Sequence, residues 1–395
     1  MPGPLAGVRV VDLSAILSGP LATMMLADQG ADVIKVEPPG VGDLMRLGPF
    51  RRGGLAAFFA NANRGKRAIT VNLEKDTGRE IVRELVKRAD VFVQNFRPGA
   101  IDRLGLGEPA LRAIRPDLIY VSISGFGDTG PYAQRRVYDP IIQALTGNVA
   151  IQRHHEIQLP DLVRNVVCDK ASAYTAAQAI TAALFARERG AGGQHVRIPM
   201  LDAALAFFWP DGMMAHTIVG DDVDAPGPTL YEIYRLTETA DGYLIYFAAS
   251  QDEFHGLFRA LDHPEWCDDP RFGGYEGRGA HAEELGAVLY EAFRVHETAT
   301  LIERMIAEQV PVAPVHELED VLTDPQVAHN EILIEREHPS AGLVRQARPA
   351  ARFERTLTEP GRLPPLYGEH TDEILAELGH DPDARKRLRA EGVVL

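Results

Sequence analysis

The sequence predicts an α/β protein whose main domain is a Rossmann-like, doubly wound parallel sheet, accompanied by a smaller α+β domain. Two observations support this prediction. The first half of the chain alternates short apolar runs with amphipathic helical patterns, and its first strand–helix–strand unit fits within about 30 residues. Near residues 219–228 the chain becomes acidic and rich in proline and glycine, which marks a boundary between two domains.

Strand and helix patterns alternate along the first 200 residues. Short apolar runs predict strands at 8–13, 31–37, 67–73, 90–96, 117–124 and 194–199. Amphipathic spacing predicts helices at 20–29, 77–88, 101–104, 169–187 and 200–208. In such a sheet the ligand lies beyond the carboxyl ends of the strands. This rule places Asn95, Phe96, Arg97 and the glycine-rich loop 125–131 near any bound ligand.

The second half of the chain has weaker patterns. A strand is expected at 242–247, followed by helices at 251–261, 281–294 and 298–309. From about residue 331 the chain returns to strand-like pieces at 333–334 and 342–344 and closes with a helix at 371–378. We therefore divide the chain into residues 1–218, a small domain at 225–330 and a C-terminal segment at 331–395.

Composition limits the classes of function. The formal net charge of −15 argues against broad binding to nucleic acid or anionic membranes. Cys168 and Cys267 give neither a disulfide framework nor metal-ligand spacing, which suits a reducing cytoplasm. No apolar run approaches the length of a membrane span, and residues 1–5 lack the features of a secretion signal. We expect a cytoplasmic protein.

Two local features bear on the ligand. The turn at residues 14–20 lacks the G-x-G-x-x-G spacing of a dinucleotide site, so a dehydrogenase is disfavoured. Basic residues gather around the predicted strand ends, a distribution that suits a small ligand bearing phosphate groups. The alternative is a set of unrelated solvated side chains. The residues are Arg64, Lys66, Arg67, Arg97, Arg103, Arg135 and Arg136.

Asp169 stands where the apolar run 166–168 meets the long alanine-rich helix. Aspartate is among the preferred helix N-caps, and the dipole of the helix favours an ionised carboxylate there. From this stretch alone, a capping role is the commoner explanation. An ionised, fixed carboxylate beside small residues is also a candidate oxygen nucleophile.

Several segments together resemble the class III CoA-transferase family, the group that contains formyl-CoA transferase and carnitine CoA-transferase. They occur in the family's order across nearly the whole chain, and no single segment is decisive. The segments are 4–13, 30–40, 63–67, 94–99, 125–131, Asp169 with its helix, 193–196 and 366–373.

The resemblance implies a catalytic role for Asp169. In the family mechanism the carboxylate attacks the acyl-CoA carbonyl, giving a mixed anhydride and CoA thiolate. The thiolate then attacks the aspartyl carbonyl, forming an enzyme–CoA thioester and releasing the first acid. An acceptor acid reverses both steps. Coenzyme A and acyl-CoA are substrates here, and the resemblance implies no permanently bound cofactor and no metal.

The resemblance also implies a binding site and an assembly. Carried over residue by residue, the positions that contact CoA are Leu17, Leu73, Lys75, Asn95, Phe96, Arg97, Arg103, Arg136 and Tyr138. Arg103 and Arg136 are the implied phosphate partners, and Tyr138 lies near the thioester. The family fold has a large Rossmann-like domain, a small domain and a C-terminal segment that returns to the large one. Two subunits interlock as a homodimer.

Two departures bear on the substrates. Members that use oxalate and formate have a glycine-rich loop in the small domain, whereas the nearest run here is the stiff 225–228 segment. Leu17 stands where those members have a polar residue. The missing glycine-rich loop, together with the methionine, tryptophan and phenylalanine residues after Ala206, favours an acyl group larger or less polar than formate. Dicarboxylic, hydroxy and aromatic acids stay open.

Two other functions stay open. The related α-methylacyl-CoA racemases have a catalytic histidine where this chain has Tyr138, and a tyrosine with a pKa of about 10 is a poor base at neutral pH. A non-catalytic CoA-binding protein would tolerate loss of Asp169. His154 and His155 with Glu156 are interpreted as a loop rather than a metal site. Cys168 is interpreted as a small buried hydrophobic residue.

Overall fold

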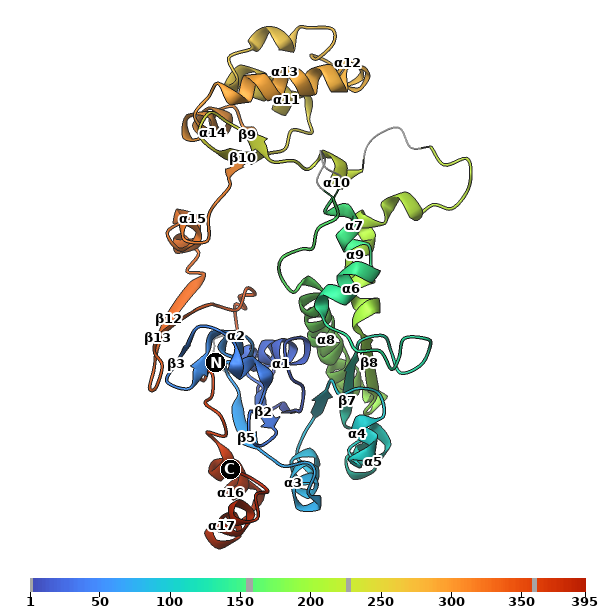
Figure 1. Cartoon of the computed structure of the whole chain (residues 1–395), viewed down its shortest axis with the longest axis vertical. Helices are drawn as coiled ribbons and strands as arrows, with labels where there is room; N and C mark the ends of the chain where they lie inside the picture. Colours follow the sequence, from blue (N-terminus) through green and yellow to red (C-terminus); the bar gives the residue numbers. More distant parts are fainter. Residues whose placement is uncertain (1–2, 154–158, 225–228, 357–360) are drawn as a thin grey trace. The chain divides into compact units, whose positions relative to one another are not determined.

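The computed structural model of the protein describes residues 3–153, 159–224, 229–356 and 361–395. The chain divides into two compact units (Figure 1). Unit 1 comprises Met1–Val219 together with Glu331–Leu395, and unit 2 comprises Gly220–Asn330. None of the described helices combines the length and the apolar character that crossing a bilayer requires.

A six-stranded sheet forms the centre of unit 1. Its strands run in the order β5-β2-β1-β6-β7-β8, and every neighbouring pair is parallel. Their bounds are β1 Arg9–Asp12, β2 Asp32–Glu37, β5 Arg67–Thr70, β6 Val91–Gln94, β7 Ile119–Ser124 and β8 His195–Pro199. The parallel α/β sheet is therefore confirmed. The strand order reverses between β1 and β6, where open α/β sheets bind their ligands.

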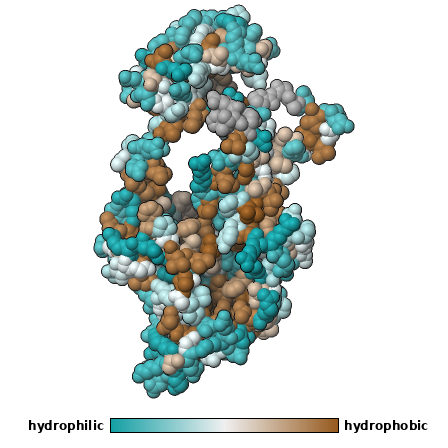
Figure 2. Space-filling model, viewed as in Figure 1, coloured by the Kyte–Doolittle hydropathy of each residue, from teal (hydrophilic) through white to brown (hydrophobic). Residues whose placement is uncertain are grey.

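Helices α6 (Asp139–Leu145) and α9 (Met200–Gly212) of unit 1 leave large apolar side chains exposed. The short helix α7 (Asn148–Ile151) follows α6 in the chain. On α6 and α9, Ile141, Leu145, Phe207 and Trp209 are exposed. Figure 2 shows apolar surface, coloured brown, over this group of elements. Exposed apolar patches of this kind often mark interaction surfaces.

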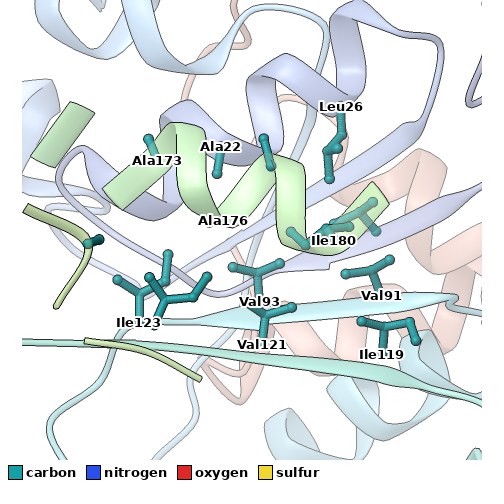
Figure 3. Packing of buried hydrophobic residues seen from close by; sticks show 14 of the residues in the cluster. Ala22, Leu26, Val91, Val93, Ile119, Val121, Ile123, Ala173, Ala176 and Ile180 are labelled. Carbon is teal, nitrogen blue, oxygen red and sulfur yellow. The ribbon is translucent and has the colours of Figure 1, made fainter. Parts of the chain in front are cut away.

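The first core of the sheet lies under helices α1 (Ser18–Asp28) and α8 (Val167–Ala186). Alanines at the contact, among them Ala22 of α1 and Ala176 of α8, bring the two helices close together (Figure 3). Val93 and Val121 of the sheet lie beneath them. This packing holds the N-terminal ends of α1 and α8 in one region.

The second core lies on the opposite face, because neighbouring strand residues such as Val10 and Val11 belong to different clusters. The helices of unit 1 whose residues contribute to this core are α3 Asp76–Lys87, α4 Ala100–Arg103, α5 Glu108–Ile114, α16 Thr371–Leu378 and α17 Pro382–Ala390. Ile374 and Leu375 of α16 are fully buried there. The end of the chain is therefore an integral part of unit 1.

The strand-like pieces after residue 331 do not join the main sheet. They form a separate antiparallel hairpin of β12 Leu333–His338 and β13 Gly342–Ala347. Val344 and Ala341 pack against a small cluster near α2 Ala57–Asn63 and the hairpin of β3 Arg51–Arg52 and β4 Leu55–Ala56. Both strands are longer than expected, because they pair with each other along their whole length from Leu333–Ala347 to His338–Gly342.

Unit 2 has its own core around a three-stranded antiparallel sheet in the order β11-β10-β9. The strands are β9 Thr237–Glu238, β10 Tyr243–Tyr246 and β11 Val312–Pro314. The helices are α10 Leu230–Ile233, α11 Gln251–Ala260, α12 Tyr275–Ala280, α13 Ala282–Arg294, α14 Thr298–Ala307 and α15 Pro325–His329. Phe258, Phe293 and Leu301 are buried at its centre.

Candidate active site

Asp169 is not the N-cap of its helix, so the predicted capping role is wrong. The helix α8 begins at Val167 with Val166 as N-cap, and Asp169 is its third residue. The backbone amide of Asp169 donates instead to Oδ2 of Asp139, at 2.9 Å. Because α8 begins two residues before Asp169, the amides that follow Asp169 are bonded within the helix, and its carboxylate caps none of them. It is nevertheless buried, with the residue only 8% exposed.

The Asp169 carboxylate lies beside Ser18, the first residue of α1. Burial, and secondly the charge of Asp139, raise the pKa of Asp169 to about 6, although hydrogen bonds from the Ser18 hydroxyl and backbone amide oppose the shift. The N-terminal end of α1 therefore helps to stabilise the ionised carboxylate. The sequence had assigned this role to the dipole of α8. Above pH 6 the group is a buried carboxylate with an unusually basic oxygen.

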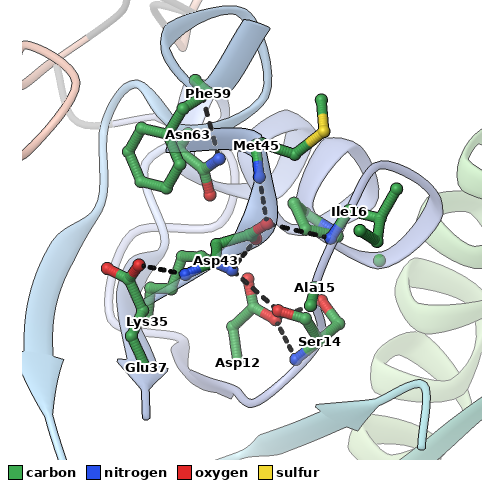
Figure 4. Close-up of polar contacts among 12 residues, drawn as sticks. Asp12, Ser14, Ala15, Ile16, Lys35, Glu37, Asp43, Met45, Phe59 and Asn63 are labelled. Carbon is green, nitrogen blue, oxygen red and sulfur yellow. Dashed lines mark hydrogen bonds and ion pairs between the residues drawn. The ribbon is translucent and has the colours of Figure 1, made fainter. Parts of the chain in front are cut away.

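The turn before α1 is held in an unusual conformation. Ile16 has a φ of 69°, in a region that β-branched residues rarely adopt. Its amide donates to Oδ1 of Asp43 at 3.2 Å, and Nζ of Lys35 donates to the Ser14 carbonyl at 2.7 Å (Figure 4). A side chain at Gly19 would bring its Cβ to 2.2 Å from Ser14. Buried polar contacts and one required glycine therefore set where α1 begins.

A buried ionic network supports this turn. Lys66 Nζ lies 3.0 Å from Asp12 Oδ2, and Lys35 Nζ lies 3.0 Å from Asp43 Oδ2. Burial opposes ionisation of Asp12, but Lys66 and Lys35 outweigh it and hold its pKa at about 2. Lys66 also donates to the Pro20 carbonyl of α1 at 2.8 Å. The network ties the start of α1 to β1 and β2.

Three of the basic residues predicted to bind a phosphate ligand instead form ion pairs within the fold. Arg64 forms a buried pair with Asp28, and Lys66 is enclosed with Asp12. Arg67 bonds Asp32, Glu373 and Glu377. The prediction is wrong for these three, because their partners lie within the fold. Arg97, Arg103, Arg135 and Arg136 are exposed.

Two of the implied CoA contacts lie directly beside the turn. Leu17 is the buried N-cap residue of α1. Asn95, which follows β6, accepts a bond from the Ala15 amide at 2.9 Å and donates to the Ala15 carbonyl at 2.7 Å. The adjacent Phe96 is half-buried against the second core, and Arg97 is exposed. The structure therefore joins the ends of β1 and β6 at the point where the strand order reverses.

The remaining implied contacts stand on separate elements at the same edge of the sheet. Leu73 and Lys75 follow β5, and the ammonium of Lys75 bonds the Glu391 carbonyl of the C-terminal segment. Arg103 is the last residue of α4. Arg136 and Tyr138 precede α6 and are both exposed.

Sequence reasoning missed Ser18, Asp43 and Asp139. The only signal for Asp139 was its position after Tyr138 and before a proline that opens a helix.

Cys168 is buried, and burial raises the pKa of its thiol to about 12, which agrees with its interpretation as a small buried residue. His154, His155, Glu156 and the segment 225–228 lie outside the described residues. Within the described part of the chain, no three histidine, cysteine or acidic side chains cluster as a metal site.

The fold has counterparts among known proteins. Residues 5–371 match the model of CoA-transferase family III, and the chain belongs to this family. It is similar to a solved CAIB/BAIF family protein from Brucella suis, with 34% identity and a TM-score of 0.83. The match covers 96% of this chain and 100% of that one.

Two curated relatives carry the class of activity. The chain is 34% identical to human succinyl-CoA:glutarate CoA-transferase, over 99% of this chain and 90% of the relative. It is 36% identical to succinyl-CoA:mesaconate CoA-transferase of Haloarcula marismortui, over 96% and 97%. The protein is thus an enzyme that transfers CoA between carboxylic acids.

Proposed function

We propose that the protein is an acyl-CoA:carboxylate CoA-transferase in which Asp169 becomes covalently modified in turn by the acyl group and by CoA. The observation that carries this proposal is the buried carboxylate of Asp169, which has a raised pKa and is bonded by Ser18 at the start of α1. Burial strips water from the carboxylate and makes it a better nucleophile. Its family membership supplies the matching chemistry.

Each step of the proposed cycle balances. An Asp169 oxygen bonds the acyl carbon while the C–S bond breaks and CoA leaves as thiolate. The thiolate then bonds the aspartyl carbon, and the first acid leaves with the bridging oxygen. The acceptor carboxylate displaces CoA from the aspartyl carbon, and the thiolate finally takes the acceptor acyl group. During the attacks on the aspartyl carbon, the Ser18 donors stabilise the negative charge that develops on the aspartyl oxygen.

We propose that the nine implied contacts in unit 1 bind CoA. Leu17 and Asn95 lie beside the turn that leads into Ser18. The other seven residues follow the carboxyl ends of β5, β6 and β7: Leu73, Lys75, Phe96, Arg97, Arg103, Arg136 and Tyr138. The exposed guanidinium groups of Arg97, Arg103 and Arg136 suit phosphate oxygens, to which arginine presents a planar pair of donors.

The proposed substrates are dicarboxylic acids of four or five carbons. The relatives' names support this class, since they pair succinyl-CoA with glutarate or mesaconate. Leu17, a buried apolar residue at the start of α1, agrees with an acid larger than formate. A panel of donors and acceptors tests this choice. Formate and oxalate as the best pair would overturn it.

Oxygen transfer tests the covalent mechanism directly. With enzyme in excess and an ¹⁸O-carboxylate acceptor, one turnover puts label into Asp169 and leaves the released donor acid unlabelled. A second turnover then carries that oxygen into the donor acid. Label in the donor acid during the first turnover would indicate direct attack by the acceptor and overturn the proposal. Deuterium entering the α-carbon without any acceptor would instead indicate racemase chemistry.

We propose further that the enzyme is a homodimer whose subunits interlock, as the family resemblance implies. The exposed apolar side chains of unit 1 support a partner subunit, among them Phe185, Phe207 and Tyr174. Such side chains are normally covered when they lie close together. Light scattering coupled to size exclusion measures the mass. A monomer at micromolar concentration would contradict this proposal.

A further inference from the structure

Asp139 is a buried carboxylate that the proposed cycle does not use. It is the first residue of α6 and only 2% exposed. Its Oδ2 accepts the Asp169 amide at 2.9 Å, and its Oδ1 accepts from Gln143 Nε2 at 2.5 Å. Both oxygens therefore have a donor, and one donor belongs to the nucleophile's own backbone.

Gln143 fixes Asp139 to the chain that leads into α8. Its Nε2 also lies within hydrogen-bond reach of the Val163 and Asn165 carbonyls, at 3.1 and 3.2 Å. Its Oε1 accepts from the Val163 amide at 3.0 Å. Gln143 is itself 1% exposed. Because α6 and the start of α8 are joined in this way, Asp139 cannot move away from Asp169 without breaking several buried bonds.

The groups that donate hydrogen bonds to the two carboxylates are uncharged. Ser18 donates neutral hydrogen bonds to Asp169, and Gln143 donates neutral hydrogen bonds to Asp139. The Cys168 thiol beside them is uncharged at neutral pH, since burial raises its pKa to about 12. The neighbouring Lys170 is exposed, and its ammonium donates to Asn165 Oδ1 at 3.3 Å. Two like charges held in a buried site repel each other strongly.

We propose that Asp139 is a positioning residue that favours the covalent forms of the enzyme over the free carboxylate. This inference rests on the proposed covalent function of Asp169. Converting Asp169 into an anhydride or a thioester removes one of the two buried negative charges. Asp139 thereby opposes the return of the enzyme to its unmodified state, and it holds the start of α8 in place through the Asp169 amide.

A proton on Asp169 and an acyl group on Asp169 both neutralise the same charge, so Asp139 favours both by the same electrostatic repulsion. Removing the charge of Asp139 therefore shifts the acid limb of kcat/KM to lower pH. It also lowers the equilibrium fraction of enzyme that carries CoA. Each unit of pH shift corresponds to about a tenfold loss in the equilibrium constant for modification.

The test uses two neutral variants of the full-length enzyme. Asp139→Asn keeps an oxygen to accept the Asp169 amide, but it turns an NH₂ group toward Gln143. Asp139→Ser is smaller, and its hydroxyl can both donate and accept. Both variants should move the acid limb downward and reduce the CoA adduct that intact-protein mass spectrometry detects after incubation with acyl-CoA alone. Having two variants keeps the test decisive if one of them does not fold.

Gln143→Ala is the matched control. It removes the contacts of the Gln143 side chain with Asp139 and with residues 163–165, but it retains the charge of Asp139. This variant should therefore lower stability without moving the acid limb downward. An acid limb that stays fixed in the Asp139 variants, or moves down equally in Gln143→Ala, would overturn the inference. Absence of any CoA adduct on the wild-type enzyme would instead overturn the covalent function itself. The two failures are therefore distinguishable.

Discussion

Asn95 bonds both backbone groups of Ala15. Its side-chain oxygen accepts the Ala15 amide at 2.9 Å, and its side-chain nitrogen donates to the Ala15 carbonyl at 2.7 Å. These bonds join the loops after β6 and β1, and they lie one residue before the left-handed Ile16. A residue implied in CoA binding therefore also holds the turn that brings Ser18 to Asp169.

Asn95→Leu tests this dual role. The substitution keeps the size of the side chain and removes both bonds, so the turn shifts and the Ser18 donors move away from Asp169. We expect kcat/KM to fall about 100-fold, since a misplacement of about 1 Å costs this much in oriented reactions. The acid limb of the pH profile should also rise, because the Ser18 bonds lower the pKa of Asp169. Steady-state kinetics across pH 5–8 measures both effects.

The control for Asn95 is Gln346→Ala. Gln346 also bonds a backbone carbonyl with its side-chain amide, that of Ala60 at 2.9 Å, but it belongs to the β12–β13 hairpin. Its loss should leave the acid limb unchanged. If Asn95→Leu retained kcat/KM within twofold and the same pH profile, the turn would not depend on Asn95.

Asp43 should be essential for stability. Its carboxylate pairs with Lys35, and both are fully buried. Asp43→Asn places a neutral amide against the buried ammonium, and breaking such a pair from one side costs about 3 kcal/mol. Urea unfolding at pH 7 measures this loss. The double variant Asp43→Asn with Lys35→Met removes the stranded charge, so it should be less destabilised than the two single variants added together. Additive losses would contradict this coupling.

The parallel sheet could be predicted from sequence because its signal is local. The central strands β6 and β7 are short, mostly apolar runs, and their burial on both faces produces that pattern. The roles of the basic residues could not be predicted in this way. Lys66 bonds Asp12, which lies 54 residues away in the sequence, and Arg64 bonds Asp28, which lies 36 residues away. Nothing in the sequence around a lysine or arginine reports a partner so far away.

In the candidate site, too, local features could be predicted from the sequence, whereas contacts between distant residues could not. Asp169 was found because it stands at the start of a helix and because the family resemblance assigns it a role. Its predicted capping role was wrong because the helix begins two residues earlier, at Val167. Asp139, 30 residues earlier in the chain, accepts the Asp169 amide. Ser18 and Asp43 act through a turn in which Ile16 has a positive φ. A β-branched residue gives no sequence signal for that conformation.

Asp169→Asn should stabilise the fold while abolishing transfer. The folded pKa of about 6 lies above the ordinary value of 3.8, so the stability that this group contributes is present below pH 3.8 and is lost as the pH rises through 6. At pH 7 the neutral amide avoids this loss, and we expect a gain of up to about 3 kcal/mol in the free energy of unfolding. Urea unfolding at pH 7 and at pH 4 measures it.

The comparison between the two pH values is the internal control for Asp169→Asn. The gain should be largest at pH 7 and nearly absent at pH 4, where the wild-type carboxyl is itself protonated. A variant that is equally destabilised at both pH values would contradict the raised pKa of Asp169. It would indicate instead that the amide disturbs the packing of α1 against α8.

Arg67 should fasten the C-terminal helix α16 to the sheet. Its buried guanidinium bonds Asp32 through two nitrogens, at 2.8 and 3.0 Å. It also bonds Glu373 at 3.0 Å and Glu377 at 2.6 Å, both on α16. Arg67→Met keeps the apolar stem and removes every bond. We expect a loss of about 2 kcal/mol, less than for a fully enclosed pair because the three carboxylates are partly exposed.

Hydrogen exchange localises the effect of Arg67→Met. Amides of α16 should exchange faster, while those of β6 and β7 at the centre of the sheet keep their relative protection. The matched control is Arg345→Met, which breaks an exposed pair with Glu335 at 2.6 Å. An exposed pair contributes at most about 1 kcal/mol, so this control should leave exchange in α16 unchanged. If Arg67→Met behaved like Arg345→Met, the attachment of α16 would depend on its apolar contacts through Ile374 and Leu375 alone.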